Sequence, residues 1–314
     1  MVDLTAKLSQ ALQLCGVDSP QFTHQLIGQG AWHEAYLIKQ AQQPPLVVRL
    51  RKQVIYGEVA LFDREELHSD YAPVGLYYEW ANRCQPAVCP TIYHYHVSPE
   101  LSCTVESYMS QQFDYTKLSE AEARQMGQAL GRFFRQMHQQ PAPISGHGEI
   151  GWREGGLVPE ADLSPAAVWQ THPAPRQIEQ LAAARLPFEA QIVQNKIEFI
   201  WQHSRYPHEP FTLVNRDITP ENLIASSGRF TALIDPVPML DNAAKFAAWF
   251  LFCYKFLLPA YNPIPRYAHH QFQQYAPILN HVAAGYLEAY TQNDPTLKRQ
   301  IRYAYYHVIQ QIQI

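Results

Sequence analysis

Lysine and arginine are outnumbered by aspartate and glutamate in this sequence. The chain of 314 residues carries 24 lysine and arginine residues against 28 aspartate and glutamate residues, and its formal net charge is −4 at pH 7. Proteins that bind nucleic acid typically concentrate basic residues into a patch or stripe that contacts phosphates. The sequence has no such stripe, so it gives no support for a nucleic-acid partner.

Cysteine is scarce, and the chain does not open on an apolar leader. The five cysteines form an odd number, which together with the missing leader favours a reducing, cytoplasmic location. Cys84 and Cys89 are followed by His94 and His96, but this spacing fits no standard zinc finger. We therefore expect buried thiols beside strand histidines rather than a zinc site.

Long hydrophobic runs are also missing. The longest, residues 246–260, contains Lys255 and is too short by our prediction to span a bilayer. We expect it to form a buried helix, and we expect no membrane partner. With 47% hydrophobic residues, the chain can form one large domain or two lobes around an ample core.

The first third of the chain has the pattern of a small antiparallel sheet with an opening helix. Leucine and alanine at helical spacing predict a helix over residues 3–14. Runs of apolar residues predict five strands, over 22–27, 34–39, 46–50, 91–96 and 103–108. Residues 77–83 are predicted to be helical.

Helices dominate after residue 108. Ser119 and Glu122 have the spacing of a capping box, and apolar residues follow on one helical face. Residues 140–175 are rich in proline and glycine and are predicted to form a loop. Residues 177–203 and those from 242 onward are predicted to be helical. The pattern predicts a strand-rich lobe over 1–108 and a helix-rich lobe over 109–314.

The stretch that carries most chemical information is 212–235, which reads TLVNRDITPENLIASSGRFTALID. Asp217 lies five residues before Asn222, the interval of the phosphoryl-transfer loop H-R-D-x-x-x-x-N. Residues 223–225 and 230–234 are predicted to be strands joined by a turn. Their antiparallel pairing would place Asn222 beside Asp235, where an amide and a carboxylate oxygen can hold Mg²⁺. Asp217 can then accept the proton of a hydroxyl group, whereas a simple turn would leave this spacing unexplained.

With these residues, the segment resembles the catalytic core of the aminoglycoside phosphotransferase and choline kinase family. Pro220 precedes Asn222 by two residues as in that family, and the hairpin ends in Ile234, Asp235 and Pro236. The resemblance implies an α+β, bilobal, protein kinase-like fold. Its small antiparallel-sheet N-lobe would bind nucleotide, and its larger, mainly helical C-lobe would carry the catalytic loop and bind the acceptor.

Three positions depart from the pattern of that family. Asn215 stands where the family has histidine, Arg216 where it usually has glycine, and Lys245 where it has a later aspartate. Asn215 can still hydrogen-bond to neighbouring backbone, so we interpret it as a structural variant. Asp241 either supports the catalytic loop or caps the helix that follows.

The resemblance implies a role for each candidate site residue. Asp217 is the expected catalytic base, and Asn222 and Asp235 are the expected magnesium ligands. Arg49, at the end of the third predicted strand, is expected to contact the α- and β-phosphates. Arg51 and Lys52 are the alternatives at that position.

Further residues complete the expected nucleotide site. Gly28 and Gly30, between the first two strands, would let backbone N–H groups approach phosphate, although a plain hairpin turn explains two glycines equally well. Glu79 is predicted to pair with Arg49, with Glu65 and Glu66 as alternatives. Residues 105–108 resemble the hinge segment that binds adenine through its backbone.

These features predict a kinase that uses ATP or GTP with Mg²⁺ and phosphorylates a hydroxyl group of a small molecule. The acceptor would be a sugar, an amino alcohol or an antibiotic-like compound. A protein kinase is disfavoured because no Ala-Pro-Glu and no activation segment follow Asp235. The few carboxylates after Pro236 weigh weakly against a polycationic aminoglycoside. The alternatives are a catalytically weak nucleotide-binding or scaffold protein, which Asn215 and Lys245 would favour, and a helical binding protein unrelated to kinases.

Overall fold

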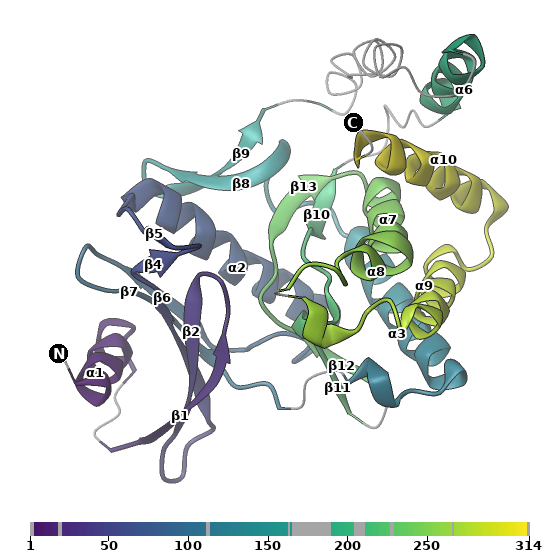
Figure 1. Cartoon of the computed structure of the whole chain (residues 1–314). Coiled ribbons are helices and arrows are strands. Elements are labelled where there is room, and N and C mark those ends of the chain that lie inside the picture. The colour runs from purple at the N-terminus through teal and green to yellow at the C-terminus, as the bar shows by residue number, and fades with distance from the viewer. Residues whose placement is uncertain are drawn as a thin grey trace. The chain divides into compact units, whose positions relative to one another are not determined.

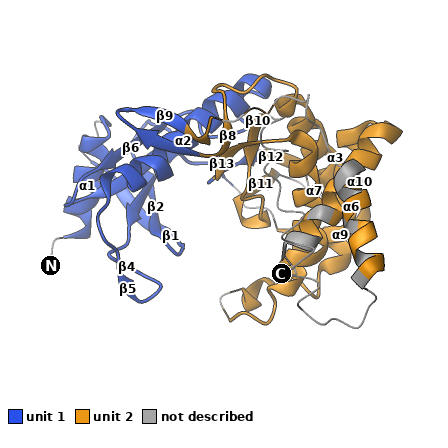
Figure 2. Ribbon diagram, turned by 90° about the horizontal axis from the view of Figure 1, so that it is seen from above, with its two compact units in different colours: residues 1–110, 150–158, 232–235 blue, residues 111–149, 159–231, 236–314 orange. Residues whose placement is uncertain are grey.

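The computed structural model describes residues 3–17, 21–110, 114–162, 164, 190–203, 211–226, 229–265 and 267–312 (Figure 1). The chain forms two compact units. Unit 1 comprises residues 1–110, 150–158 and 232–235, and unit 2 comprises residues 111–149, 159–231 and 236–314 (Figure 2). Unit 1 is built around an antiparallel sheet and unit 2 mainly from helices, so the predicted α+β class is confirmed.

The sheet of unit 1 has five antiparallel strands in the order β1-β2-β3-β7-β6. All five were predicted from their apolar runs and are confirmed. They are β1 (Thr23–Gln29), β2 (His33–Lys39), β3 (Leu46–Arg51), β6 (Tyr93–Val97) and β7 (Ser102–Ser107). A short hairpin, β4 (Val54–Ile55) and β5 (Glu58–Val59), follows the third strand. Its turn residues Tyr56 and Gly57 both have positive φ, at 54° and 87°, as two-residue hairpin turns require.

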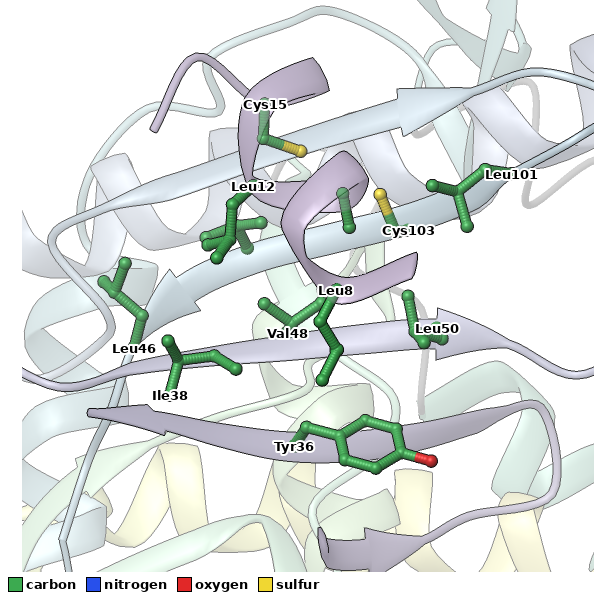
Figure 3. Close-up of a cluster of buried hydrophobic side chains, with 12 residues drawn as sticks. Leu8, Leu12, Cys15, Tyr36, Ile38, Leu46, Val48, Leu50, Leu101 and Cys103 are labelled. Carbon is green, nitrogen blue, oxygen red and sulfur yellow. The ribbon is translucent and has the colours of Figure 1, made fainter. Parts of the chain in front are cut away.

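One face of this sheet is covered by the first helix, α1 (Leu4–Leu14), which Figure 3 shows lying across the strands. Asp3 caps the helix by accepting a hydrogen bond from the Thr5 N–H at 3.2 Å. Leu8 and Leu12 pack on alternate strand residues such as Val48, because every second side chain of a strand points to the same face. The residues between them, Arg49 and Glu106 included, therefore point to the opposite face.

The helix α2 (Arg64–Cys84) is much longer than the predicted segment 77–83. It begins after Asp63, whose carboxylate accepts a hydrogen bond from the Glu66 N–H at 3.0 Å. Its buried face includes Tyr71, Tyr77 and Tyr78. This face brings tyrosine hydroxyl groups to the side of the sheet that α1 leaves open, where β6 also contributes the Tyr93 hydroxyl, which donates to the carbonyl oxygen of Tyr71 at 2.9 Å.

Unit 2 is mainly helical, and the capping box that was predicted from Ser119 and Glu122 is confirmed. The predicted helix over 177–203 is confirmed where the structure describes it, and residues 177–189 lie outside the described residues. The longer helices are α3 (Glu120–His138), α6 (Ala190–His203), α7 (Ala243–Phe252), α9 (Ala276–Thr291) and α10 (Pro295–Ile312). Shorter helical segments are η1 (Tyr115–Lys117), η2 (Pro220–Asn222), η3 (Cys253–Leu257), α8 (Leu258–Ala260) and η4 (Ala268–His270).

The helices α3 and α9 approach each other closely because glycines line their contact. A Cβ atom added at Gly127 would lie 2.0 Å from the carbonyl oxygen of Val282. A Cβ atom added at Gly285 would lie 2.0 Å from the carbonyl oxygen of Arg124. Since no real Cβ atom tolerates such a separation, the backbones pack in direct contact and hold the centre of unit 2 together.

Short strands surround the segment that was predicted to be catalytic. The predicted hairpin is confirmed as β11 (Leu223–Ser226) and β12 (Arg229–Leu233). A second sheet, in the order β10-β13-β8-β9, was not predicted. Its strands are β8 (His147–Arg153), β9 (Gly156–Ala161), β10 (Thr212–Asn215) and β13 (Pro238–Asp241).

The prediction of a loop over residues 140–175 is therefore wrong for the residues that form β8 and β9. Two of its residues, Glu154 and Gly155, have positive φ of 50° and 84° and form the turn between these strands. The richness in glycine reflects a hairpin turn. Residue 163 and residues 165–175 lie outside the described residues.

The apolar run 246–260 forms part of one helical stretch, Ala243–Ala260, that combines α7, η3 and α8. This stretch is long and apolar enough to cross a membrane by length and composition, so the prediction that the run is too short is wrong. The predicted buried helix is confirmed, because 56% of the stretch is buried inside the protein. Phe250 and Tyr254 are fully buried, and the Phe250 ring stacks on Tyr286 with 3.9 Å between centroids. Core helices of soluble proteins pass the same length and composition test.

Candidate active site

Arg49 is the centre of a charged cluster in unit 1. Its Nε atom donates a hydrogen bond to Glu106 Oε1 at 2.9 Å, and its guanidinium group lies 3.6 Å from Asp235 Oδ2. The side chains of Arg49 and Glu106 are 17% and 4% exposed, so both charges are largely removed from water. Burial alone would lower the pKa of Arg49, but Asp235 and Glu106 outweigh it and raise this pKa. Arg49 is therefore a permanent cation.

Two hydrogen bonds of Tyr78 connect Glu106 to Asp235 and close this cluster into a ring. Its hydroxyl group donates to Glu106 Oε2 at 3.0 Å and accepts from the backbone N–H of Asp235 at 3.1 Å. Asp235 has a φ of 50°, a left-handed conformation that is uncommon outside glycine and is concentrated at functional sites. The Asp235 side chain is 57% exposed. The ring thus fixes the backbone of Asp235 while its carboxylate reaches solvent beside a buried cation.

The predicted pairing of Arg49 with Glu79 is wrong, and Glu106 takes that place. Glu79 is exposed and forms an ion pair with Arg83 one helical turn further on. Because Tyr78 faces the sheet, its neighbour Glu79 is rotated by about 100° towards solvent. The alternatives Glu65 and Glu66 are exposed in the first turn of α2.

The sequence did contain a signal for Glu106. It stands in a buried strand next to Val105, on the face opposite the core residues Cys103 and Val105. A single carboxylate in an apolar strand needs a buried cation as its partner. Strand alternation places Arg49 on that same face, so the pair could have been found from the two strands together.

Gly30 lies in the connection between β1 and β2, as predicted, whereas Gly28, which was also predicted there, lies within β1. Lys52 holds this connection from both sides: its Nζ donates to the Gly30 carbonyl at 2.6 Å, and its N–H donates to the Trp32 carbonyl at 2.8 Å. A Cβ atom added at either glycine would be 3.7 Å from its nearest neighbour, an ordinary contact. The packing of the chain itself therefore does not require glycine at these two positions.

His33 occupies the position where a third glycine would stand in the full phosphate-loop motif. Its Nε2 atom lies 2.8 Å from the Tyr71 hydroxyl oxygen. Burial lowers the pKa of His33 to about 4, with Asp235 opposing and Arg49, Arg51 and Lys52 adding to the decrease. At neutral pH His33 is thus an uncharged hydrogen-bonding group among three cations.

In unit 2, Asn215 braces the loop that carries Asp217. Its Oδ1 atom accepts hydrogen bonds from the N–H of Asp217 at 3.0 Å and from the N–H of Val237 at 2.9 Å. Asn215 is completely buried at the end of β10. It therefore ties the loop that carries Asp217 to the segment that follows Asp235, and the expected hydrogen bonding of Asn215 to neighbouring backbone is confirmed.

The loop itself is held by short local contacts. The Thr219 N–H donates to Asp217 Oδ1 at 3.3 Å, and the indole N–H of Trp249 donates to the Arg216 carbonyl at 3.0 Å. The loop ends in the turn η2, where the Asn222 N–H donates to the Thr219 carbonyl at 3.1 Å. Asn222 is 9% exposed. Asp217 is partly exposed.

Lys245 also has a structural role. Its Nζ atom lies 2.7 Å from Asp241 Oδ2, and His147 Nε2 lies 3.7 Å from Asp241 Oδ1. Burial acts to raise the pKa of Asp241, but nearby Lys245 and His147 and the hydrogen bond from the Asn242 N–H lower it to about 2. Asp241 lies in β13, and Asn242 is the residue that caps α7, by accepting from the Ala244 N–H at 2.9 Å and the Lys245 N–H at 3.2 Å. The helix is therefore capped by Asn242, and the capping role considered for Asp241 is wrong.

The predicted site residues are thus divided between the units. Gly28, Gly30, Arg49, Glu79 and Asp235 belong to unit 1, and Asp217 and Asn222 belong to unit 2. Within unit 1 the structure brings Arg49 and Asp235 together. The approach of Asn222 to Asp235 stays a prediction.

This combination of fold and loop residues defines a kinase-like phosphotransferase. Residues 23–238, more than half of the chain, match the model of the phosphotransferase enzyme family. The chain belongs to this family, and it is a kinase in the broad sense. The unrelated helical binding protein is therefore excluded, and the suspected family is confirmed. No curated protein sequence matches the chain significantly.

Solved structures show the same fold. The macrolide 2′-phosphotransferase MphH from Brachybacterium faecium is 12% identical with a TM-score of 0.53, covering 98% of this chain and 90% of that one. The ternary complex of APH(2″)-IIa with streptomycin and ATP gives 12% identity and a TM-score of 0.53, with 99% and 90% covered. A Thermobifida fusca protein described as a fructosamine-3-kinase is 14% identical with a TM-score of 0.50, covering 96% of this chain and 99% of that one.

Proposed function

We propose that this phosphotransferase moves the γ-phosphoryl group of ATP or GTP to a hydroxyl group of a small molecule, with Mg²⁺ as cofactor. The observation that carries the proposal is the ring of hydrogen bonds and one ion pair formed by Arg49, Glu106, Tyr78 and Asp235. It holds a buried permanent cation beside a solvent-exposed carboxylate. Such a pair suits the two charges of a magnesium nucleotide, because the cation attracts phosphate and the carboxylate attracts the metal.

The donor set fits magnesium. Mg²⁺ prefers oxygen ligands and usually keeps several water molecules beside one or two protein carboxylates. Asp235 supplies an exposed carboxylate on a backbone fixed by Tyr78, and Asn222 would supply an amide oxygen. The ion would neutralise charge on the β- and γ-phosphates.

The residues around the nucleotide would have separate roles. Arg49 would bind the α- and β-phosphates, as an arginine can do with two parallel hydrogen bonds. Gly28 and Gly30 would allow the β1–β2 connection to approach phosphate, which gives a reason for two glycines that packing alone does not require. With these roles, unit 1 would supply the residues that contact the phosphates.

Asp217 would orient the acceptor hydroxyl group and take its proton. The hydroxyl oxygen forms a bond to the γ-phosphorus, the bond from this phosphorus to the β–γ bridging oxygen breaks, and ADP or GDP leaves. The rate would come mainly from positioning and from neutralising the phosphates. Asn215 would position Asp217 through the N–H that it binds.

A small-molecule acceptor is favoured by the family, and the relatives support a range of acceptor types. The similar structures include a macrolide phosphotransferase, a phosphotransferase in complex with streptomycin and a protein described as a fructosamine kinase. For this chain we propose a sugar, amino alcohol or antibiotic-like acceptor. We also propose a cytoplasmic location, in keeping with the buried cysteines Cys15, Cys89, Cys103 and Cys253, which form no disulfide in the described chain.

A catalytically weak binding protein finds less support. Asn215 and Lys245 were the two departures in its favour, and both have structural partners. Asn215 holds the backbone of the catalytic loop, and Lys245 neutralises buried Asp241. Neither substitution removes a residue that the proposed reaction needs.

The test is an acceptor screen with ATP or GTP and Mg²⁺. Pools of macrolides, aminoglycosides, ketoamines and amino alcohols are incubated with the protein, and phosphorylated products are detected by mass spectrometry. We expect one acceptor class to be phosphorylated by the wild type, and Asp217→Asn to lower kcat by about 10²- to 10⁴-fold, the usual contribution of a positioned acid or base. A product formed equally fast by Asp217→Asn would contradict the role of this residue.

A further inference from the structure

A cluster of metal-binding side chains lies beside the catalytic loop of unit 2 and is not used by the proposed reaction. Glu221, His269 and His270 each offer one ligand atom, and these atoms all lie within 4.8 Å of one another. The Nε2 atom of His270 is 2.7 Å from Glu221 Oε1. Glu221 lies in the turn η2, directly before Asn222, and the two histidines lie in the turn η4.

The chemistry of these ligands differs from that of the proposed nucleotide metal. Magnesium prefers an all-oxygen environment, whereas two imidazole nitrogens and one carboxylate suit zinc and similar transition metals. We propose that Glu221, His269 and His270 form a binding site for a transition-metal ion of the zinc class. This site joins the turn η2 of the catalytic loop to the turn η4.

The structure holds His270 in place for such a role. Its ring stacks on Phe272 with 4.8 Å between centroids and an interplanar angle of 14°. Phe272 in turn stacks on Tyr115 at 5.6 Å, and the Tyr115 hydroxyl donates a hydrogen bond to the His270 carbonyl. The His270 side chain is 13% exposed. A ligand whose ring is fixed by packing loses little rotational freedom when it binds a metal.

The other two ligands, Glu221 and His269, can rotate to fit the metal ion. Bond lengths of about 2.0–2.2 Å for zinc to nitrogen and oxygen place two ligand atoms of a tetrahedral ion about 3.4 Å apart. Glu221 Oε1 and His270 Nε2 must therefore separate slightly from 2.7 Å, and the ligand atom of His269 already lies within 4.8 Å of both. Glu221 is 49% exposed and His269 is exposed, so rotation of these side chains meets little resistance. The Gln271 residue that ends η4 has a φ of 53° and keeps the two histidines on a tight turn.

The competing explanation is a simple ion pair between Glu221 and His270 that holds the loop without metal. The two explanations differ in what zinc alone does to the whole protein. His281 supplies a matched control, because its Nε2 atom lies 3.3 Å from Glu120 Oε2 in a pair without a second histidine. His269→Ala is the first variant, since this exposed side chain contributes little to folding.

The experiment is calorimetric titration of the chelator-treated full chain with zinc chloride, for the wild type, His269→Ala, Glu221→Gln and His281→Ala. We expect the first two variants to lose more than about 10-fold in affinity at one site, because a lost ligand costs at least as much as a lost outer hydrogen-bond partner. His281→Ala should bind as the wild type does. With cobalt chloride, the wild type should show a visible absorption band that His269→Ala weakens.

The proposal also predicts which residues zinc protects from amide hydrogen exchange. Zinc should slow amide hydrogen exchange of residues 217–222 in the wild type and leave it unchanged in His269→Ala. Identical zinc affinities for the wild type, His269→Ala and Glu221→Gln would overturn the proposal and leave the ion pair as the explanation. This test needs neither nucleotide nor acceptor, so it can fail while the proposed phosphotransferase activity stands.

Discussion

Arg49 shows how the environment of a single side chain decides its partner. It lies on the face of β3 opposite the core, where Glu106 is the nearest buried carboxylate and Tyr78 provides a hydroxyl group from the neighbouring helix. The exposed Glu79, one residue further along the helix, belongs to a different surface. The charge of a residue can be read from the sequence, but its partner depends on which face of each element it occupies.

Replacement of Glu106 tests the buried pair. In Glu106→Gln, Arg49 keeps its charge but loses its buried counter-charge. We expect the free energy of unfolding to fall on the order of 3 kcal/mol, because the buried charge of Arg49 is then opposed only by the largely exposed Asp235. Glu79→Gln is the matched control and should change this free energy by less than about 0.5 kcal/mol, as surface substitutions do. Urea unfolding measures the free energy of unfolding of both variants. Equal losses of this free energy would argue against the pairing of Arg49 with Glu106.

His138 at the end of α3 gives a prediction for pH dependence. Burial lowers its pKa to about 3, its Nδ1 atom lies 2.9 Å from the Tyr290 hydroxyl oxygen, and its Nε2 atom is buried without a hydrogen-bond partner among the described residues. Between pH 6.5 and 3 the unfolded chain therefore binds a proton that the folded chain does not. Stability falls as the pH is lowered through this range, by about 2 kcal/mol from pH 7 to 5 for this group.

The measurement is urea unfolding of the wild type and His138→Gln at pH 7 and pH 5. The variant should lose about 2 kcal/mol less than the wild type between these two pH values. His33, whose pKa is lowered to about 4 by burial, contributes in the same direction and is present in both proteins. A wild type and a variant with the same pH dependence would show that His138 is protonated in the folded state.

At the scale of elements, the contact of α3 with α9 depends on missing side chains. An alanine at Gly127 would favour the helix by about 1 kcal/mol. Its Cβ atom, however, would lie 2.0 Å from the Val282 carbonyl oxygen, which is backbone and cannot move aside cheaply. The steric effect should dominate, and Gly127→Ala should destabilise unit 2 by about 1–3 kcal/mol or more.

Gly156→Ala provides the comparison for this variant. Nothing lies within 4 Å of the Cβ atom that would be added there, and the φ of Gly156 is not positive. Urea unfolding should therefore show little loss for Gly156→Ala and a clear loss for Gly127→Ala. A stabilised Gly127→Ala would mean that the helices separate at low cost.

The elements differ in how far they could be predicted. The five strands of unit 1 contain apolar and β-branched residues, and the hairpin 223–233 has a clear turn, so these sequence patterns were enough to predict them. The start of α2 was missed because its first turn is polar and exposed and because Pro73 stands inside the helix. The strand β13 was missed because four residues carry no period, and it forms only by pairing with β10 and β8.

The candidate site, like the fold, could be predicted only in part from the sequence. The loop residues Asp217, Asn222 and Asp235 are close in sequence, and their spacing carries the information. Glu106 and Tyr78 come from other elements, and only the tertiary structure brings them to Arg49. Asn215 could be recognised as a substitution, but its hydrogen bond to Val237 joins residues 22 positions apart and follows from the fold.

At the scale of the whole molecule, the chain passes between the units several times. Unit 1 includes residues 150–158 and 232–235 in addition to the N-terminal segment. Asp235, which pairs with Arg49, thus reaches unit 1 from the far end of the catalytic hairpin. The division of roles into a nucleotide-binding lobe over 1–108 and an acceptor-binding lobe over 109–314 stays a prediction. A fragment of residues 1–108 would lack Asp235.

The central claim is that the ring around Arg49 and Asp235 binds a magnesium nucleotide, and the melting temperature of the full chain tests it most directly. It is measured with ATP or GTP, with and without Mg²⁺, for the wild type and Asp235→Asn. Asparagine tolerates the left-handed φ of 50°, so this variant should fold. A nucleotide at 100 times its Kd should stabilise the wild type by about 2.7 kcal/mol.

We expect a magnesium-dependent rise in the melting temperature of the wild type and the loss of its magnesium-dependent part in Asp235→Asn. That result would establish the nucleotide site independently of the acceptor. No rise with either nucleotide, or an equal magnesium-dependent rise in Asp235→Asn, would contradict the site as described.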